Sequence, residues 1–415
     1  MKNSIKYGWL VGLLFLSKLL AGQSISNSAY NVFGLGSLEQ TGLISFEGMG
    51  YAAIGARPDD LVNIKNPAAL NSINGRGFTQ IFDVGISFSV LNQQSGNEVA
   101  NGTFGGLHDL NYWFRTHRKW AWSVGISRFS DASYDIIDTP SGALANAESS
   151  VEHRGNGGST QVYFAGAYSL LPSLHLGVKT GFLFGGMQSD ESLVLSEPGT
   201  SLLIENDRSF LTSFVETGIQ YEQSLGASSK LVLGATYRPG NMVSVKQEET
   251  IIGDTGLSND SLFSEGSSSL FIPRKVGAGL GIHLKSWNLN VDYEYENWGK
   301  NEKQDRFTYQ DRFIGSFGAQ FVKDPRSEKL IERMAFRLGG GVHSNYVSVD
   351  GEDYLNQYYT LGLGFPARRG TAGINVSYQH YRAGTSDFNL IRESTHTIGV
   401  NITFKDIWFR KKVFY

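Results

Sequence analysis

One pattern constrains the fold of this chain more than any other: large apolar residues alternate with small or polar ones along most of its length. In the segment 82–90, which reads FDVGISFSV, every second residue is large and apolar. A period of two is that of a β-strand with one apolar and one polar face. The same alternation recurs in the segments 120–127, 174–184, 275–284, 287–296, 361–365, 374–378 and 398–404. The sequence therefore predicts an all-β fold.

The composition indicates the environment of these strands. The chain contains 50 Gly, 19 Tyr, 26 Phe and 7 Trp, which suit strands and tight turns better than helices. It has no cysteine, and its formal net charge of -3 suggests no nucleic-acid partner. No apolar run after the amino terminus is long enough for a membrane helix. Strands with an apolar outside and a small or polar inside are typical of a transmembrane β-barrel.

The amino terminus carries an export signal. Lys2 and Lys6 precede a mostly apolar run over 7–20, and small residues follow at Ala21 and Gly22. This pattern predicts a signal peptide over residues 1–23. An uncleaved anchor helix is the alternative, although the run is shorter than the roughly 20 residues that span a bilayer. The protein is therefore expected to leave the cytoplasm.

We count about fourteen strands between Phe78 and Phe404, each near the ~9–11 residues that a tilted membrane strand needs. Short connections at 116–119, 171–173, 285–286 and 366–369 alternate with long polar segments at 131–157, 187–207, 247–270 and 382–392. Short turns on the periplasmic side and long loops outside are usual for outer-membrane barrels, and an even strand count places both chain ends in the periplasm. The charged link Lys323–Arg333 is an exception that we expect to carry a helical turn.

A soluble secreted β-protein, such as a propeller or tandem sandwiches, is the alternative fold. Such a protein would show shorter strands, with turn signals about every 8–12 residues.

The segment Gly48–Leu70 breaks the alternation and ends in Asn66-Pro67-Ala68-Ala69-Leu70. A barrel of about fourteen strands has a lumen that wall side chains alone do not fill. We therefore expect a hatch over residues 24–76 inside a barrel over 77–404, with a periplasmic tail over 405–415. Pro67 restricts Asn66, whose side chain satisfies backbone groups in a turn. An ordinary turn before the first strand is the alternative.

These residues resemble the hatch of the long-chain fatty-acid transporter (FadL) family of outer-membrane proteins. The matching stretches are 48–70 and a strand pair that includes Pro273, Trp287, Val291-Asp292-Tyr293 and Trp298. The resemblance implies a fourteen-stranded barrel with a hatch in its lumen. It makes Asn66, Pro67 and Ala68 the hatch or gate motif, and Gly48, Gly50, Asp59 and Asp60 candidates for hatch packing. The opening 28–36 and the ending 406–412 are similar to a Bacteroidota branch of FadL-like barrels, most of which have no assigned substrate.

Two further groups of residues have more than one interpretation. Gly339, Gly340 and Gly341, like Gly105-Gly106, form either a strand kink that opens a lateral exit or a space for the hatch. Lys179, Arg274, Lys275 and Glu294 bind either a carboxylate headgroup or the hatch. We favour the hatch, because the polar walls of a plugged lumen need partners.

Nothing in the sequence points to catalysis. The eight histidines are scattered, and no Gly-x-Ser-x-Gly or His-Glu-x-x-His pattern occurs. We therefore predict no enzyme activity, no catalytic residue, no cofactor and no metal site. The acidic cluster Asp350–Asp353 is interpreted as a solvated turn, with a calcium site as the alternative.

Two functions fit an outer-membrane barrel of this kind. In the first, which we favour, the barrel takes up a small hydrophobic or amphipathic molecule, with outer-membrane lipid around it. In the second, the barrel is permanently plugged and is a subunit of an outer-membrane protein secretion or assembly complex. The basic, aromatic tail 407–415 is then a candidate contact for a protein partner.

Overall fold

The computed structural model describes residues 28–73, 77–96, 98–138, 150–194, 201–226, 228–254, 259–302, 307–349, 351, 354–367, 370–384 and 391–407. The expected signal peptide, most of the acidic cluster at 350–353 and the tail beyond Ile407 therefore lie outside the described residues.

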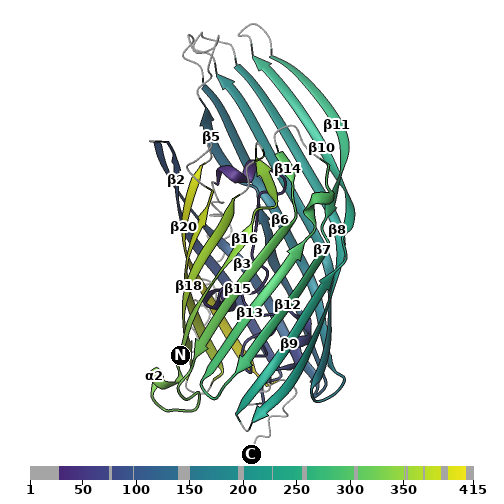
Figure 1. Ribbon diagram of the computed structural model, residues 1–415. Coiled ribbons are helices and arrows are strands. Elements are labelled where there is room, and N and C mark those ends of the chain that lie inside the picture. Colours follow the sequence, from purple (N-terminus) through teal and green to yellow (C-terminus); the bar gives the residue numbers. More distant parts are fainter. Residues whose placement is uncertain are drawn as a thin grey trace, which may run out of the picture.

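Fourteen antiparallel strands form a closed barrel (Figure 1). In chain order they are β2 (Gln80–Ser95), β3 (Glu98–His117), β4 (Trp120–Asp131), β6 (Ser150–Ser169), β7 (Leu174–Val194), β8 (Ser201–Gly226), β9 (Ser229–Arg238), β12 (Lys275–His283), β13 (Trp287–Glu296), β15 (Arg312–Phe321), β16 (Ala335–Ser344), β18 (Leu355–Pro366), β19 (Ala372–Ala383) and β20 (Arg392–Asp406). The ring closes between β2 and β20, from Gln80↔Asp406 to Gln94↔Arg392. The predicted fold class and strand number are confirmed.

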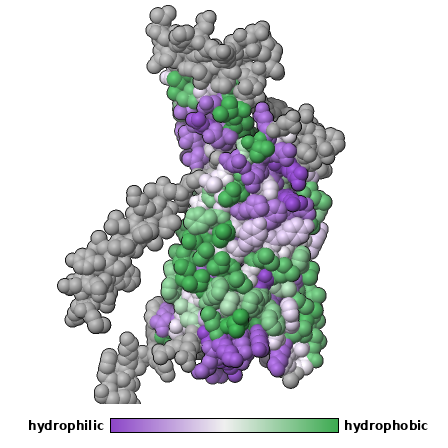
Figure 2. All heavy atoms as spheres, turned by 90° about the vertical axis from the view of Figure 1, so that its left-hand side faces the viewer, coloured by the Kyte–Doolittle hydropathy of each residue, from purple (hydrophilic) through white to green (hydrophobic). Residues whose placement is uncertain are grey.

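Side chains alternate across the wall as the sequence predicts. On β13, Val291 and Tyr293 are 57% and 56% exposed and face outward, whereas Asp292 and Glu294 are 2% exposed and face the lumen. The outward residues form a broad hydrophobic surface between polar ends (Figure 2). This arrangement lets lipid contact the outside while the backbone hydrogen bonds stay within the closed sheet.

Six further short or extending strands complete the sheets. β1 (Ser37–Leu38) pairs with β4, and β5 (Tyr134–Asp138) continues β4 along β6. β10 (Asn241–Asp254) continues β9 after Pro239, and β11 (Asn259–Ile272) leads through Pro273 into β12. β14 (Phe307–Tyr309) and β17 (Val347–Val349) form a separate two-stranded sheet. The proline breaks explain why two barrel strands each divide into a lower and an upper part.

For two segments the prediction of a loop is wrong, because the structure has strands there. Most of 187–207 belongs to β7 and β8, and most of 247–270 belongs to β10 and β11. These upper strand segments rise beyond the other strands as a projecting sheet (Figure 1). Polar residues occupy both of its faces, so the alternation that marks a strand in lipid disappears although the backbone pairing continues. The helical turn expected in Lys323–Arg333 is present as α2 (Leu330–Arg333).

The remaining helices are short: η1 (Ala29–Val32), η2 (Ile44–Met49), η3 (Pro67–Asn71) and η6 (Trp298–Lys300). Within the described residues, no helix is long and apolar enough to cross a membrane. The first three belong to the amino-terminal segment 28–73, which lies within the barrel and is mostly buried. Its first residue, Ser28, bonds to Glu393 near the start of β20, at the long-loop end, and the segment descends from there to β2. The prediction of a periplasmic amino terminus falls on residues outside the described ones, but the described segment begins at the opposite end of the lumen.

The outward face predicts a sharp position dependence for charge. Leu361→Arg places a guanidinium near the middle of β18, where Leu361 is 56% exposed, and is expected to cost about 2–4 kcal/mol. Leu330→Arg, on the turn α2 where Leu330 is 49% exposed, is the control and is expected to change stability by less than about 0.5 kcal/mol. Urea unfolding from lipid vesicles, followed by tryptophan fluorescence, measures both. Equal effects would show that β18 does not face lipid.

Candidate functional site: the hatch and its contacts with the lumen

A ladder of charges on the lumen side joins the hatch to the barrel wall. Three carboxylates of β13, on Asp292, Glu294 and Glu296, face inward because the strand alternates. Three cations, Lys65 of the hatch with Lys275 and Arg312 of the wall, balance them. We call these six buried side chains the charge ladder. Since three negative and three positive side chains make it up, the ladder is neutral as a whole. Each of its buried charges has an opposite partner.

Lys65 is the hatch residue at the centre of the charge ladder. Its Nζ lies 2.7 Å from Glu294 Oε1 and 3.3 Å from Asp292 Oδ2, and it donates to the carbonyl oxygen of Tyr51 at 2.8 Å. Burial alone would lower the pKa of Lys65, but the two carboxylates raise it above its ordinary value. Asp292 also accepts hydrogen bonds from the backbone N–H groups of Ala53 and Ile54, at 2.6 and 2.9 Å. One carboxylate thus holds two separate parts of the hatch.

The motif Asn66-Pro67-Ala68 begins the last helical turn of the hatch. Asn66 Oδ1 accepts from the N–H of Ala68 at 3.1 Å, as an N-cap, and Pro67 occupies the first helical position. Asn66 Nδ2 donates to the carbonyl oxygens of Ile54, at 2.9 Å, and Ile219 of β8, at 3.2 Å. The same side chain therefore caps η3, closes a turn within the hatch and bonds to the barrel backbone.

Arg57 holds the part of the hatch that lies toward the short-turn end. Its Nη1 donates to Gln220 Oε1 at 2.8 Å, Nη2 donates to Asn71 Oδ1 at 3.1 Å, and Nε lies 3.3 Å from Glu222 Oε2. Burial lowers the pKa of the Arg57 guanidinium to about 10, and Glu222 opposes this shift. Arg57 therefore stays charged at neutral pH.

Glycines let the hatch backbone touch the wall. Gly50 has a φ of +60°, and a methyl group built on it would lie 2.5 Å from the backbone nitrogen of Gly340. A methyl group on Gly48 would lie 2.7 Å from Cα of Gly362, and one on Gly339 would lie 2.3 Å from the carbonyl carbon of Met49. These distances leave no room for any side chain at the contacts between hatch and wall.

An aromatic cluster fills the lumen at the long-loop end. Trp298, Tyr309 and Tyr346 are buried there, with the rings of Trp298 and Tyr346 4.8 Å apart. Tyr346 Oη accepts from the N–H of Leu35 at 2.9 Å and donates to the carbonyl oxygen of Gly36 at 2.6 Å. The cluster therefore fixes the first part of the hatch as the charge ladder fixes its middle.

Within the described strands, the wall separates between β3 and β4. Their pairing starts at Asp109↔Ser127 and continues toward the short-turn end. Above this point β4 pairs instead with β1 of the hatch, through Ser37↔Asp131. Gly105 and Gly106 lie on the separated part of β3. By contrast, β16, with Gly339, Gly340 and Gly341, pairs with both neighbours without a register shift, so the pairing does not support the predicted kink there.

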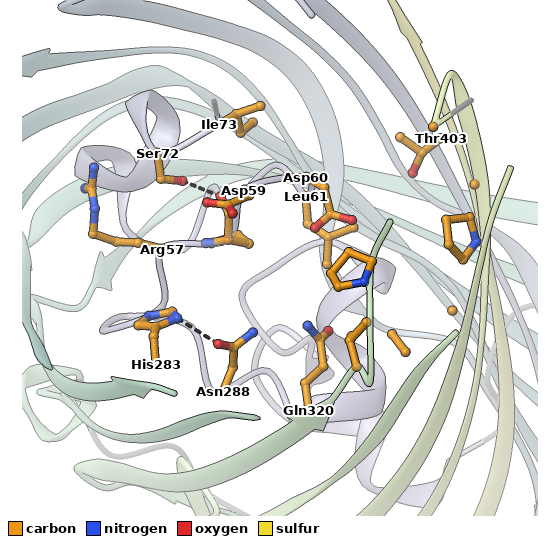
Figure 3. Close-up of a pocket in the computed structure, with 18 of the residues that line it drawn as sticks. Arg57, Asp59, Asp60, Leu61, Ser72, Ile73, His283, Asn288, Gln320 and Thr403 are labelled. Carbon is orange, nitrogen blue, oxygen red and sulfur yellow. Dashed lines mark hydrogen bonds between the residues drawn. The ribbon is translucent and has the colours of Figure 1, made fainter. Parts of the chain in front are cut away.

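A cavity of about 730 Å³ lies below the hatch, toward the short-turn end (Figure 3). Charged and polar side chains such as Arg57, His283 and Arg337 line it together with apolar ones such as Phe365 and Ile374. Asp59 and Asp60 are exposed and line this cavity, and Lys405 of β20 donates to the carbonyl oxygen of Asp60 at 2.5 Å. A second cavity, of about 50 Å³, lies between Tyr30 and Tyr381 at the long-loop end. Neither is an apolar chamber for a hydrophobic molecule.

The structure brings some sequence-predicted residues together and separates others. Lys275 and Glu294 meet in the charge ladder, and Lys179 lies 3.2 Å from Glu216 and 3.5 Å from the carbonyl oxygen of Ile64. Arg274 is exposed on the other face of the wall.

The sequence analysis did not identify Arg57 and Lys65 as residues that hold the hatch. The available signal was that a charged residue in a small, apolar hatch requires a partner in the polar face of a strand. Within the described residues, no group of three acidic or histidine side chains is placed to hold a metal ion.

The closed barrel, inner hatch and polar lumen define a plugged barrel of the FadL type. Three solved structures show the same fold. A FadL homologue of Pseudomonas aeruginosa matches with a TM-score of 0.63 and 10% identity over 88% of this chain and 99% of that one. The CymD monoaromatic hydrocarbon channel has a TM-score of 0.59 and 14% identity, over 90% and 100% of the two chains. The toluene transporter TbuX of Ralstonia pickettii has a TM-score of 0.59 and 15% identity, over 91% and 99%. At these identities the likeness shows the fold alone.

The family is shown by sequence: the BamG family model matches residues 4–415, and the chain belongs to the BamG family. A comparison with curated protein sequences finds no match.

The charge ladder predicts a large effect of one hatch substitution. Lys65→Met leaves Asp292 with an uncompensated buried charge, while Glu294 keeps Lys275, and it is expected to destabilise the hatch by about 3–5 kcal/mol. Limited proteolysis of the folded barrel in detergent is expected to cut near residue 57 in the variant and not in the native protein. Lys230→Met removes a half-exposed partner of Glu222 and is expected to cost less than about 1 kcal/mol. Equal protection of Lys65→Met and native protein would contradict the role of Lys65.

The glycine contacts predict an effect of a single methyl group. A methyl group on Gly177 of β7 would lie 2.3 Å from the backbone nitrogen of Ala68, so Gly177→Ala is expected to cost about 1–3 kcal/mol. Gly186 lies on the same strand with open space around it, and Gly186→Ala is the control. Hydrogen exchange of hatch amides should rise in the first variant alone. Unchanged exchange would show that the hatch is not seated on β7.

Proposed function

We propose that this protein is a permanently closed barrel of the outer membrane that serves as a membrane-embedded subunit of a protein secretion or assembly complex. The observation that carries the proposal is the fixed hatch. Buried ion pairs hold it at Arg57 and Lys65, and the aromatic cluster holds its first part. Opening this hatch would separate several buried charge pairs at once, and each charge left buried without its partner costs about 3–5 kcal/mol.

The cavities support the same proposal. A pocket for a small hydrophobic molecule is typically apolar, with a volume of roughly 300–1,000 Å³. The cavity of this size in the described residues lies below the hatch and is lined by charged as well as apolar side chains, and the one at the long-loop end holds little more than water. The projecting sheet adds a large surface that a channel does not require.

Uptake of a small hydrophobic or amphipathic molecule is the second candidate function. The separation of β3 from β4 supports it, since β1 fills that position with only two paired residues. The fold likeness to proteins described as hydrocarbon channels adds support. In this case the hatch segment 28–43 would move away from the wall while Lys65 stayed in place.

The location follows under either function. The short-turn end, where Ile407 lies after β20, would face the periplasm, and the projecting sheet would face the exterior. The similarity of the two chain ends to a Bacteroidota branch of FadL-like barrels is the basis for assigning a source in that group.

Purification and flux measurements together separate the two functions. We expect the native protein, isolated in mild detergent, to recover at least one other protein in fixed stoichiometry. Purified into liposomes, it should admit neither toluene nor a long-chain fatty acid above the rate of empty vesicles. Lys65→Met serves as the loosened control. Facilitated entry by the native protein, with no copurifying protein, would overturn the subunit role in favour of uptake.

A further inference from the structure

The projecting sheet extends well beyond the lipid-facing surface. On β8 the last large exposed apolar side chain before the polar region is Leu211, which pairs with Phe184 of β7. From Leu211 the strand continues to Ser201, and at ~3.3 Å per residue this is about 30 Å of further sheet. β6, β7, β8, β10 and β11 form this part, and β11 lies at one side of it (Figure 1).

β11 has one paired and one unpaired edge. It pairs with β10 along its whole length, from Asn241↔Ile272 to Asp254↔Asn259. Among the described strands, no other pairs with β11. All residues from Ser261 to Ser269 are exposed, so neither face of this strand is covered by the described chain.

The base of this edge shows which backbone groups point outward. The N–H of Phe271 donates to Asn301 Oδ1 at 2.7 Å, and Asn301 Nδ2 donates to the carbonyl oxygen of Phe271 at 2.9 Å. The Asn301 side chain thus pairs with Phe271 as another strand would. Because the direction of backbone groups alternates along a strand, the N–H and C=O of every second residue beyond it point the same way. These residues are Ser269, Ser267, Glu265, Phe263 and Ser261.

This edge lacks the features that protect edges from pairing. Natural edge strands carry lysine, proline or a bulge, or are covered by other elements. β11 contains no Lys, Arg or Pro, and its pairing with β10 has no register shift. Near its upper end Leu262 and Phe263 are 71% and 63% exposed, on opposite faces. The edge is long and open, which suits addition of a strand from another chain.

The charges on the outer face define the chemistry of that strand. Asp207, Glu248 and Glu265 lie directly opposite one another across β8, β10 and β11. None of the three has an ion pair with the described part of the chain. Like charges at directly opposed positions destabilise a sheet. A second copy added at this edge would bring another Glu265 to the row, whereas a lysine or arginine there would compensate it.

We propose that β11 is the docking edge for an extended segment of a partner protein, which adds as a strand and places a lysine or arginine beside Glu265. An apolar side chain of the same segment covers Phe263. The inference rests on the proposed role of the protein as a subunit of a complex, and it names the surface through which an extracellular partner binds.

Site-specific crosslinking tests this surface. The chain has no cysteine, so Ser267→Cys introduces a single thiol at an outward position of β11. After labelling of intact cells with a benzophenone maleimide and irradiation, we expect one crosslinked partner, joined through a segment that contains Lys or Arg. A label at Gly186→Cys, on the same face of the projecting sheet but away from the edge, is the control and should not give this product.

Two pairs of variants test the backbone and the charge separately. Ser267→Pro removes an outward N–H and should reduce the copurified partner at least about fivefold, whereas Ser267→Ala keeps the N–H and should not. Glu265→Lys should reduce the partner similarly, while Glu249→Lys, an exposed charge on the other face of β10, should not. The heat-dependent gel shift of the folded barrel confirms that each variant folds.

The outcomes separate this inference from the proposed function. If a partner copurifies but all β11 variants retain it, the docking edge is wrong and the subunit role stands. If the label joins two copies of this chain, the assignment of a basic partner is wrong. If no protein copurifies with the native barrel and no crosslink forms, both proposals fail.

Discussion

The width of a fourteen-stranded barrel is the constraint on which the rest of this structure depends. Its wall side chains cannot meet across the lumen, so another part of the same chain must occupy the interior or leave it full of water. The segment 28–73 does so, and it brings polar backbone into a space with little solvent. Each buried amide and charge then needs a partner, which the inward faces of the strands provide. The acidic row on β13 supplies such partners, and the glycines on the facing strands leave room for the hatch backbone.

The sequence predicted the barrel well, because one physical rule repeats along it. Val291 and Asp292 must face different media, and that alternation is visible wherever a strand crosses lipid. The prediction failed where both faces of a strand are in the same medium. Around Glu205 and Glu248 both faces are in water, so the alternation is absent and we predicted loops there. The strand signal came from the environment, while the pairing itself is made by backbone groups that every residue has.

The hatch was predictable as a segment but less so as a set of contacts. Asn66-Pro67-Ala68 has local capping chemistry, so its turn follows from neighbouring residues. Lys65 has partners on β13, far along the chain, and no local pattern gives that pairing. The same limit explains the acidic pair Asp59 and Asp60, which are next to the well-packed Arg57 but face a solvent-accessible cavity. Which side of a compact segment meets the wall is decided by the register of the whole barrel.

The bond between Ser28 and Glu393 joins the first described residue to the last strand. β20 is also the strand that closes the ring with β2. The start of the described hatch and the seam of the ring therefore depend on the same strand. A substitution that displaced the upper part of β20 would disturb both the closure of the wall and the seat of the segment inside it.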